Sequence, residues 1–217
     1  MITRIWTILR KDLLLEWRQK YSVYGLILYL VSSVMAINLL QEKPEGTTWN
    51  SLYWLILLFV SVNAVAKSFL QESKARFIYY YTIHKPVEVI LAKLVYNIVL
   101  MMGMSLLSYL LFTLILGYPV LNPAKFLLMV LSGGISLAML FTMLSAIAGM
   151  AGGNSALIAI LGFPLVVPQL ILLSDLTQPL FELRALQGWW KYFGILVAMD
   201  LMLVVLSVVL FPFLWKE

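Results

Sequence analysis

The hydrophobic positions of this 217-residue chain fall into long runs that are separated by short polar segments. A helix needs about 20 apolar residues to cross the hydrocarbon of a bilayer, so each run is close to the length of one crossing. The uncharged stretch 126–174 is long enough for two crossings, and the glycine-rich residues 149–155 mark a turn inside it. The pattern predicts an all-α integral membrane protein with six transmembrane helices, at residues 21–40, 51–66, 87–116, 124–148, 156–173 and 192–214.

Residues 1–20 have a different pattern, because basic residues are spread among the apolar ones. Apolar side chains recur there at steps of three and four, while Arg4, Lys11 and Arg18 lie a heptad apart on another face. This pattern predicts an amphipathic helix that lies in the membrane interface. The alternative is a cytoplasmic extension of the first span. The charged residues leave no continuous apolar core of the kind that a cleavable signal peptide has.

Two of the connections between spans are long enough to hold structure of their own. Residues 67–85 contain good helix formers and end at Pro86, which suits the first turn of the next helix. Residues 174–191 carry four leucines at helical spacing, which are Leu176, Leu180, Leu183 and Leu186. We interpret 174–191 either as an amphipathic segment on the outer leaflet or as a plain loop.

The distribution of basic residues predicts the orientation of the chain. Eleven of the 15 Lys and Arg residues lie near the N-terminus, within 67–93 or at the C-terminus, and four lie in the connections on the other side. Cytoplasmic segments of membrane proteins carry an excess of Lys and Arg. Both termini are therefore expected in the cytoplasm. Residues 67–85 are then expected there too, as a cytoplasmic coupling helix between spans two and three.

The composition excludes several classes of protein. With 63% hydrophobic and 12% charged residues, six spans consume the chain and leave one membrane domain, 1–217, with no soluble catalytic domain. There is no cysteine, no glycine precedes a lysine as a phosphate-binding loop requires, and neither HExxH nor GxSxG occurs. The chain is therefore not expected to be an enzyme or to bind ATP. The net charge of +5 reflects membrane orientation, and we expect no nucleic-acid partner.

Four features of the predicted spans are candidates for a functional or packing role. Asp200 is the only acid well inside a span, where a carboxylate costs about 3 kcal/mol. It serves either as a proton or substrate relay, or as a group that is protonated or hydrogen-bonded to a neighbouring span. Pro164 and Pro168 predict a kink in the fifth span and are candidates for gating. Methionines such as Met101 and Met104 are interpreted as core packing rather than as metal ligands, and the small residues around Gly133 permit close helix contact.

The connection 67–85 holds the remaining candidate residues. Charged side chains are followed there by aromatic ones, and the sole histidine stands near the end. The candidate residues are Glu72, Lys74, Arg76, Phe77, Tyr79, Tyr80, His84 and the following Pro86. One interpretation is an aromatic belt at the membrane surface. The other is a helix that inserts into a groove of a soluble subunit, anchored by its aromatic rings and oriented by its charges.

The order of these features resembles the six-span permeases of ABC-2-type exporters, and within them the CcmB family, haem exporter protein B. The resemblance is carried by the opening ILRKDLLLEWRQK and by Glu72 followed by Pro86 and Leu91-Ala92-Lys93. It is also carried by GFPLVVPQLIL, with Pro164 and Pro168 after a glycine-rich turn. Together these motifs extend over essentially the whole chain.

The resemblance implies a non-catalytic subunit of a transporter in the bacterial inner membrane. Its partners would be a cytoplasmic ABC ATPase that binds ATP, a haem-handling membrane protein of cytochrome c maturation and a second copy of itself. The complex would deliver haem to the periplasm, and no cofactor or metal is expected to be bound directly by this chain. Two alternatives remain: an ABC-2 permease that exports a lipid, drug or polysaccharide, and an intramembrane enzyme or scaffold that uses Asp200.

Overall fold

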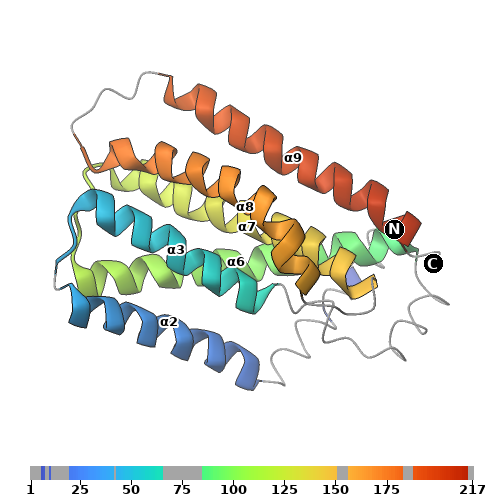
Figure 1. Cartoon of the computed structure of the whole chain (residues 1–217), viewed down its shortest axis with the longest axis horizontal. Coiled ribbons are helices and arrows are strands. Elements are labelled where there is room, and N and C mark those ends of the chain that lie inside the picture. The colour runs from blue at the N-terminus through green and yellow to red at the C-terminus, as the bar shows by residue number, and fades with distance from the viewer. Residues whose placement is uncertain are drawn as a thin grey trace.

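The structure, a computed structural model, describes residues 6–7, 10, 20–41, 43–65, 85–150, 156–182 and 188–214. Its long helices lie side by side as a bundle and alternate in direction along the chain (Figure 1). They are α2 (Lys20–Leu40), α3 (Gly46–Ala64), α6 (Pro86–Leu116), α7 (Pro123–Met150), α8 (Ala156–Thr177) and α9 (Trp189–Leu214), and the 3-10 helix η1 (Gln178–Leu180) follows α8. Within the described residues every regular element is helical, so the predicted all-α class is confirmed.

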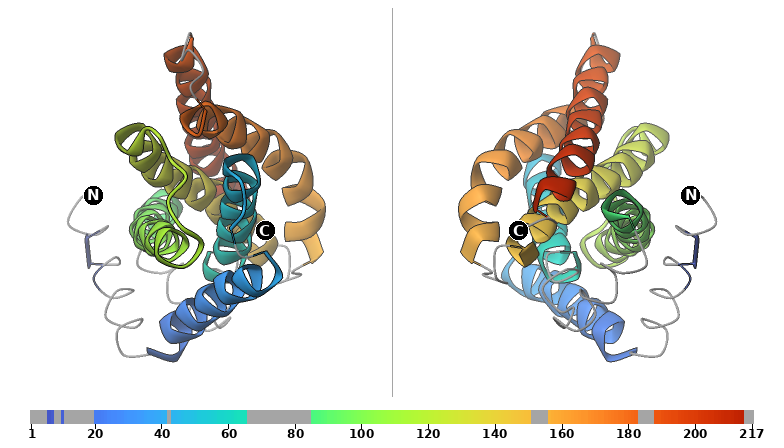
Figure 2. Two further views of the ribbon diagram at one scale, coloured as in Figure 1. Left: turned by 90° about the vertical axis from the view of Figure 1, so that its left-hand side faces the viewer. Right: turned by 90° about the vertical axis from the view of Figure 1, so that its right-hand side faces the viewer.

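Helix α7 is the centre of the bundle. It contacts α3, α6, α8 and α9, and 67% of its apolar stretch is buried. The end-on views of Figure 2 place α2 and α9 at opposite edges, and only 17% of the apolar stretch of each is buried. The outward side chains of α2 and α9 are large and apolar, as a helix that faces lipid requires.

Five helices, α2, α6, α7, α8 and α9, are long and apolar enough to cross a membrane. Helix α3 falls short of them because Thr47, Thr48 and Asn50 occupy its first turns. It nevertheless runs beside α6 and α7 (Figure 1) and buries Trp49, Tyr53 and several aliphatic side chains. Asn50 and Ser61 of α3 are therefore turned into the protein, whereas Thr47 is exposed.

Helix α3 begins at Gly46, earlier than the span predicted from Ser51, because hydrogen bonds within the bundle satisfy its polar side chains. The amide nitrogen of Asn50 donates to the carbonyl oxygen of Ser174 at 3.2 Å, and the Thr177 hydroxyl donates to Asn50 Oδ1 at 2.7 Å. The indole nitrogen of Trp54 donates to the Thr177 hydroxyl at 2.9 Å. In the sequence these residues resemble a turn. The contacts instead keep them within helix α3 and join that helix to α8.

The connection predicted at 174–191 is only partly a connection. Helix α8 continues to Thr177, and the side chains of Leu176 and Leu180 are buried in the core. Helix α9 begins at Trp189, whose indole nitrogen donates to the carbonyl oxygen of Leu176 at 2.9 Å. Leu183 and Leu186 lie outside the described residues. The described part of 174–191 therefore belongs to the bundle.

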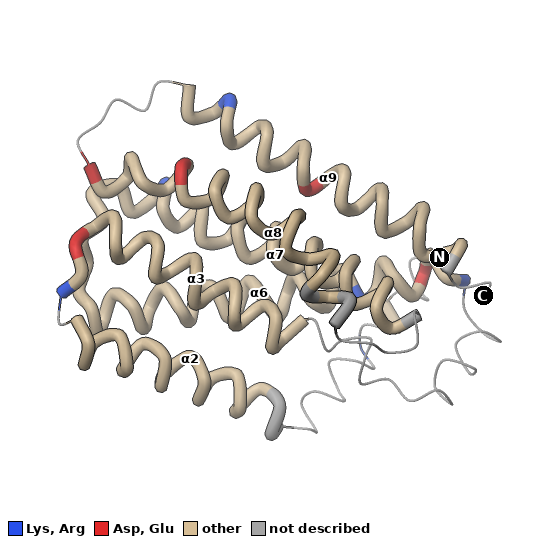
Figure 3. The backbone as a smooth tube through the Cα atoms, in the orientation of Figure 1, with Lys and Arg blue, Asp and Glu red and all other residues tan. Residues whose placement is uncertain are grey.

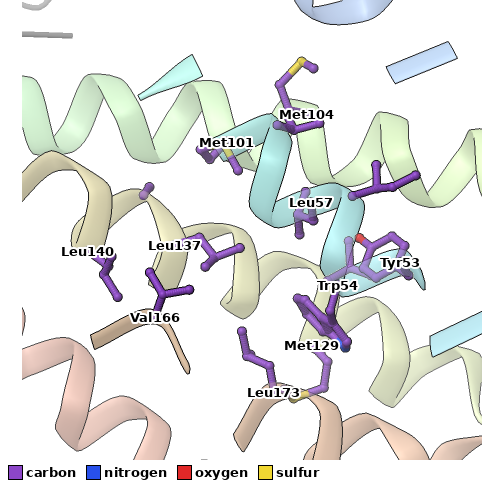
Figure 4. Close-up of a cluster of buried hydrophobic side chains, with 14 of the residues drawn as sticks. Tyr53, Trp54, Leu57, Met101, Met104, Met129, Leu137, Leu140, Val166 and Leu173 are labelled. Atoms are coloured by element: carbon purple, nitrogen blue, oxygen red, sulfur yellow. The ribbon is translucent and has the colours of Figure 1, made fainter. Parts of the chain in front are cut away.

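Aromatic rings fill the bundle at the end where α3 begins. Trp49 is fully buried, with its ring centroid 5.2 Å from that of Phe112 and 5.5–5.6 Å from those of Tyr53, Phe126 and Phe181. Deeper in the bundle the core is aliphatic and contains Met101 and Met104 of α6 and Met129 of α7 (Figure 4). These methionines lie among leucine and valine side chains, as core packing requires.

Two adjacent glycines of α7 allow its neighbours to approach closely. A Cβ atom at Gly133 would collide with the six-membered ring of Trp54 on α3. A Cβ atom at Gly134 would lie 2.8 Å from Oγ of Ser105 and 3.2 Å from the carbonyl oxygen of Met101, both on α6. The small-residue patch predicted to permit close contact therefore lies where α3 and α6 meet α7.

The described charged residues gather at the two ends of the bundle, with one exception (Figure 3). At one end the charges lie just before α3, at the starts of α7 and α9 and at the end of α8. At the other end they lie around the start of α6, as Lys85, Glu88 and Lys93. The exception is Asp200, which lies near the middle of α9.

Candidate functional site

The start of α6 is a fixed point next to the predicted coupling segment. Pro86 occupies the first turn, where its missing N–H would have no partner within the helix. The backbone N–H of Lys85 donates to Oε2 of Glu88 at 3.3 Å, and the Glu88 side chain is buried. This carboxylate also suits the positive end of the helix dipole. Residue 85 is thereby joined firmly to α6.

Most of the predicted coupling residues fall outside the part of the chain that the structure describes. These are Glu72, Lys74, Arg76, Phe77, Tyr79, Tyr80 and His84, and only Pro86 of that group is placed. The predicted interfacial helix 1–20 also lies largely outside, with Trp6, Thr7 and Arg10 described. Their roles remain predictions.

Asp200 meets two polar side chains in the middle of the bundle. The hydroxyl of Ser136 on α7 donates to Oδ1 of Asp200 at 2.6 Å. The amide nitrogen of Gln169 on α8 donates to the same oxygen at 3.3 Å and also to the Ser136 hydroxyl. Ser136 and Gln169 are fully buried, and Asp200 is half-buried. We refer to Ser136, Gln169 and Asp200 as the mid-bundle cluster; it joins α7, α8 and α9.

The two prolines lie in the same region of α8 as Gln169. Pro164 and Pro168 are both inside the helix, and Gln169 directly follows the second. Each proline removes one backbone hydrogen bond from the helix, and α8 follows an arc in the end-on views (Figure 2). The Gln169 side chain thus holds this weakened part of α8 against α7 and α9.

The hydrogen bond from Ser136 matches one of the two interpretations of Asp200, that of an acid bonded to a neighbouring span. Sequence reasoning did not identify Ser136 or Gln169 as its partners. Gln169 carried a weak signal, since glutamine is unusual in the uncharged stretch 126–174 and stands beside a proline. Among the described residues, no three His, Asp or Glu side chains come together as a metal site would require.

The comparisons with known proteins decide the family. A model of the CcmB protein family matches residues 3–214, which is nearly the whole chain. The chain belongs to the CcmB family. Searches of curated proteins and of solved structures returned no match. The resemblance seen in the sequence is thus confirmed by the family match.

Membership of the CcmB family gives the class of function. CcmB proteins are permeases of ABC transporters that serve haem export in cytochrome c biogenesis, and they work with an ABC ATPase. The five apolar helices agree with a protein that resides in a membrane.

Proposed function

We propose that this CcmB chain is a single permease domain that crosses the bacterial inner membrane six times. Helix α3 is the additional span, since it lies beside α6 and α7 and satisfies its polar side chains internally (Figure 1). Residues 1–20 form an interfacial helix and residues 67–85 a coupling helix. Both termini lie in the cytoplasm, a proposal supported by the excess of Lys and Arg on that side.

The proposed role is coupling without catalysis. A cytoplasmic ABC ATPase docks on residues 67–85, hydrolyses ATP and moves that segment, and a second copy of this chain completes a two-fold arrangement. A haem-handling membrane protein of cytochrome c maturation supplies the binding of haem, so that neither haem nor ATP is bound by this chain. The family match over residues 3–214 carries the proposal.

The contacts of α6 support a route for the movement. The Lys85–Glu88 hydrogen bond joins the end of the coupling segment to α6, and α6 packs along α7. Helix α7 in turn contacts α8, whose prolines provide a place to bend. Displacement of residues 67–85 then passes to the helices that surround the mid-bundle cluster.

The docking proposal predicts the effect of charge reversal in the coupling segment. Glu72→Lys combined with Arg76→Glu should reduce co-purification of the ABC ATPase at least tenfold, which corresponds to about 1.4 kcal/mol, because oriented charges at an interface would then meet like charges. The measurement is a pull-down of tagged protein from its own cells in mild detergent. A haem-handling membrane protein in the same pull-down would support the role in cytochrome c maturation.

The matched control reverses charges at the opposite end of the bundle. Lys43→Glu combined with Glu45→Lys changes two exposed residues just before α3 and should leave the ATPase bound. If the variant at 72 and 76 retains the ATPase as well as this control does, docking through residues 67–85 is wrong. If neither protein carries an ATPase, the proposed coupling itself is wrong.

The prolines of α8 predict that a variant without them still binds the ATPase but transports less well. Pro164→Ala combined with Pro168→Ala restores two backbone N–H groups and should straighten and stiffen α8. We expect the ATPase to stay bound while the level of mature cytochrome c falls severalfold. The measurement is haem staining of c-type cytochromes beside the pull-down. Unchanged cytochrome levels would show that bending at these prolines is not needed.

A further inference from the structure

The mid-bundle cluster has more hydrogen-bond acceptors than donors. The structure gives Asp200 Oδ1 two donors, the Ser136 hydroxyl and the Gln169 amide nitrogen. Gln169 Oε1 is buried and receives no hydrogen bond, and both described donors to Asp200 reach Oδ1 rather than Oδ2. A buried acceptor without a donor is costly, and the cost is greater in a region that excludes water. The cluster therefore lacks a hydrogen atom for the Gln169 oxygen.

No described cation supplies that hydrogen. The charged and titratable side chains on the helices that pack against α9 are Glu88, Lys93, Tyr96 and Tyr109 of α6, Lys125 of α7 and Asp175 of α8. The hydrogen-bond partners of Asp200 among the described residues, Ser136 and Gln169, are both neutral. Lys125 lies eleven residues before Ser136 on α7, which is about 16 Å along the helix axis.

We propose that Asp200 binds a proton in the middle of the membrane and that the resulting carboxylic acid forms a reciprocal pair with the Gln169 carboxamide. A carboxylic acid and a primary amide each present one donor and one acceptor side by side, so two hydrogen bonds can form between them. The Gln169 Nε2 to Asp200 Oδ1 contact at 3.3 Å is one of these bonds. The other runs from the protonated Oδ2 to Gln169 Oε1, and it satisfies both remaining acceptors. The proton comes from water, and Asp200 changes from a carboxylate to a neutral acid.

The bound proton joins α9 to α8 at the residue that follows Pro168. When Asp200 is neutral, α8 is held to α9 by two hydrogen bonds and to α7 through Ser136. Loss of the proton removes one of the two bonds and places a charge at mid-membrane depth, which is unfavourable. The site is thus a proton-binding site in the part of α8 that the prolines weaken. This inference does not depend on the ATPase or on haem.

Infrared spectroscopy of the purified complex in lipid vesicles at neutral pH tests the site directly. Subtracting the spectrum of the Asp200→Asn variant from that of the native complex should leave a carbonyl band of a protonated carboxylic acid, equivalent to one group per chain. In the Gln169→Leu variant this band should move to higher frequency, because the acid loses its hydrogen-bonded partner. A difference spectrum that contains only carboxylate bands, or no band, would overturn the proposal.

Three variants test the same site in cells. Asparagine keeps a neutral side chain that both donates and accepts hydrogen bonds, so Asp200→Asn should retain severalfold more cytochrome c maturation than Asp200→Leu. The matched control is Ser207→Ala on the same helix, which removes a buried hydroxyl that bonds only within α9 and should change neither activity nor spectrum. If Asp200→Asn fails as Asp200→Leu does, Asp200 acts as a charged carboxylate and the proposal is wrong. If Asp200→Asn cannot be purified, the difference between the native and Gln169→Leu spectra, in which the acid band should move to higher frequency, still decides the matter.

Discussion

Replacing Gly133 by leucine is expected to prevent normal packing of the bundle, at a cost of about 3 kcal/mol or more. A Cβ atom at this position would already collide with the Trp54 ring, and the isobutyl group is larger still. Trp54 cannot easily turn aside, because its indole nitrogen is hydrogen-bonded to Thr177 on α8. The collision therefore separates α3 from α7 or breaks the contact between α3 and α8.

The yield of folded protein after detergent extraction, followed by fluorescence-detected size exclusion, measures this effect. The control is Gly103→Leu on α6, where an added Cβ atom would meet nothing within 4 Å. Both variants change one glycine in a helix to leucine, so they share the change in helix propensity and differ in the collision. Equal yields of the two variants would contradict the close contact of α3 with α7.

Removing the indole of Trp49 is the second change with a large expected effect. Trp49→Ala should destabilise the bundle by about 3 kcal/mol, because the ring is fully buried and contacts four other rings. Lipid tails are as apolar as the core, so the loss consists mainly of packing contacts rather than of hydrophobic transfer. The indole N–H of Trp49 is buried without a hydrogen-bond partner, which is itself unfavourable. Because the substitution also removes this N–H, we expect a loss of stability near the lower end of the usual range.

Thermal inactivation of the purified protein, followed by loss of its monodisperse peak, measures the effect of Trp49→Ala. The control is Trp190→Ala, since that indole is 66% exposed at the start of α9 and its ring contacts are with Trp189 and Phe193 of the same helix. We expect a clear fall in inactivation temperature for Trp49→Ala and little change for Trp190→Ala. A larger fall for Trp190→Ala would mean that exposed rings at the membrane surface stabilise the protein more than the aromatic core does.

The sequence predicted the helical class well, because runs of apolar residues in a membrane have few structural alternatives. Proline and glycine also predicted local features correctly where they act through the backbone alone. Pro86 lies in the first turn of α6, and the glycine pair at 133 and 134 lies at a close helix contact. These features depend on one segment and on the bilayer, so a single sequence contains them.

Features that depend on pairing between segments were not predictable in the same way. Asn50 resembled part of a turn because its partners, Ser174 and Thr177, are more than 120 residues away in the sequence. Ser136 and Gln169 were not linked to Asp200 for the same reason, since every lipid-embedded acid needs partners but the sequence does not say which helices meet. A helix that is apolar on all sides has no polar stripe to indicate its neighbours.

The hydrogen bonds at the start of α3 have a mechanical consequence. Asn50 and Trp54 of α3 are hydrogen-bonded to Thr177, the last residue of α8. The preceding residue, Leu176, accepts a hydrogen bond from Trp189 at the start of α9. The described residues show no comparable side-chain bond between α3 and α8 at their other ends. Among the described residues, side-chain hydrogen bonds therefore join α3 and α8 at one end only. Helix α8 is about 32 Å long at 1.5 Å per residue, so a rotation of about 10° about the joined end would separate the other ends by about 6 Å.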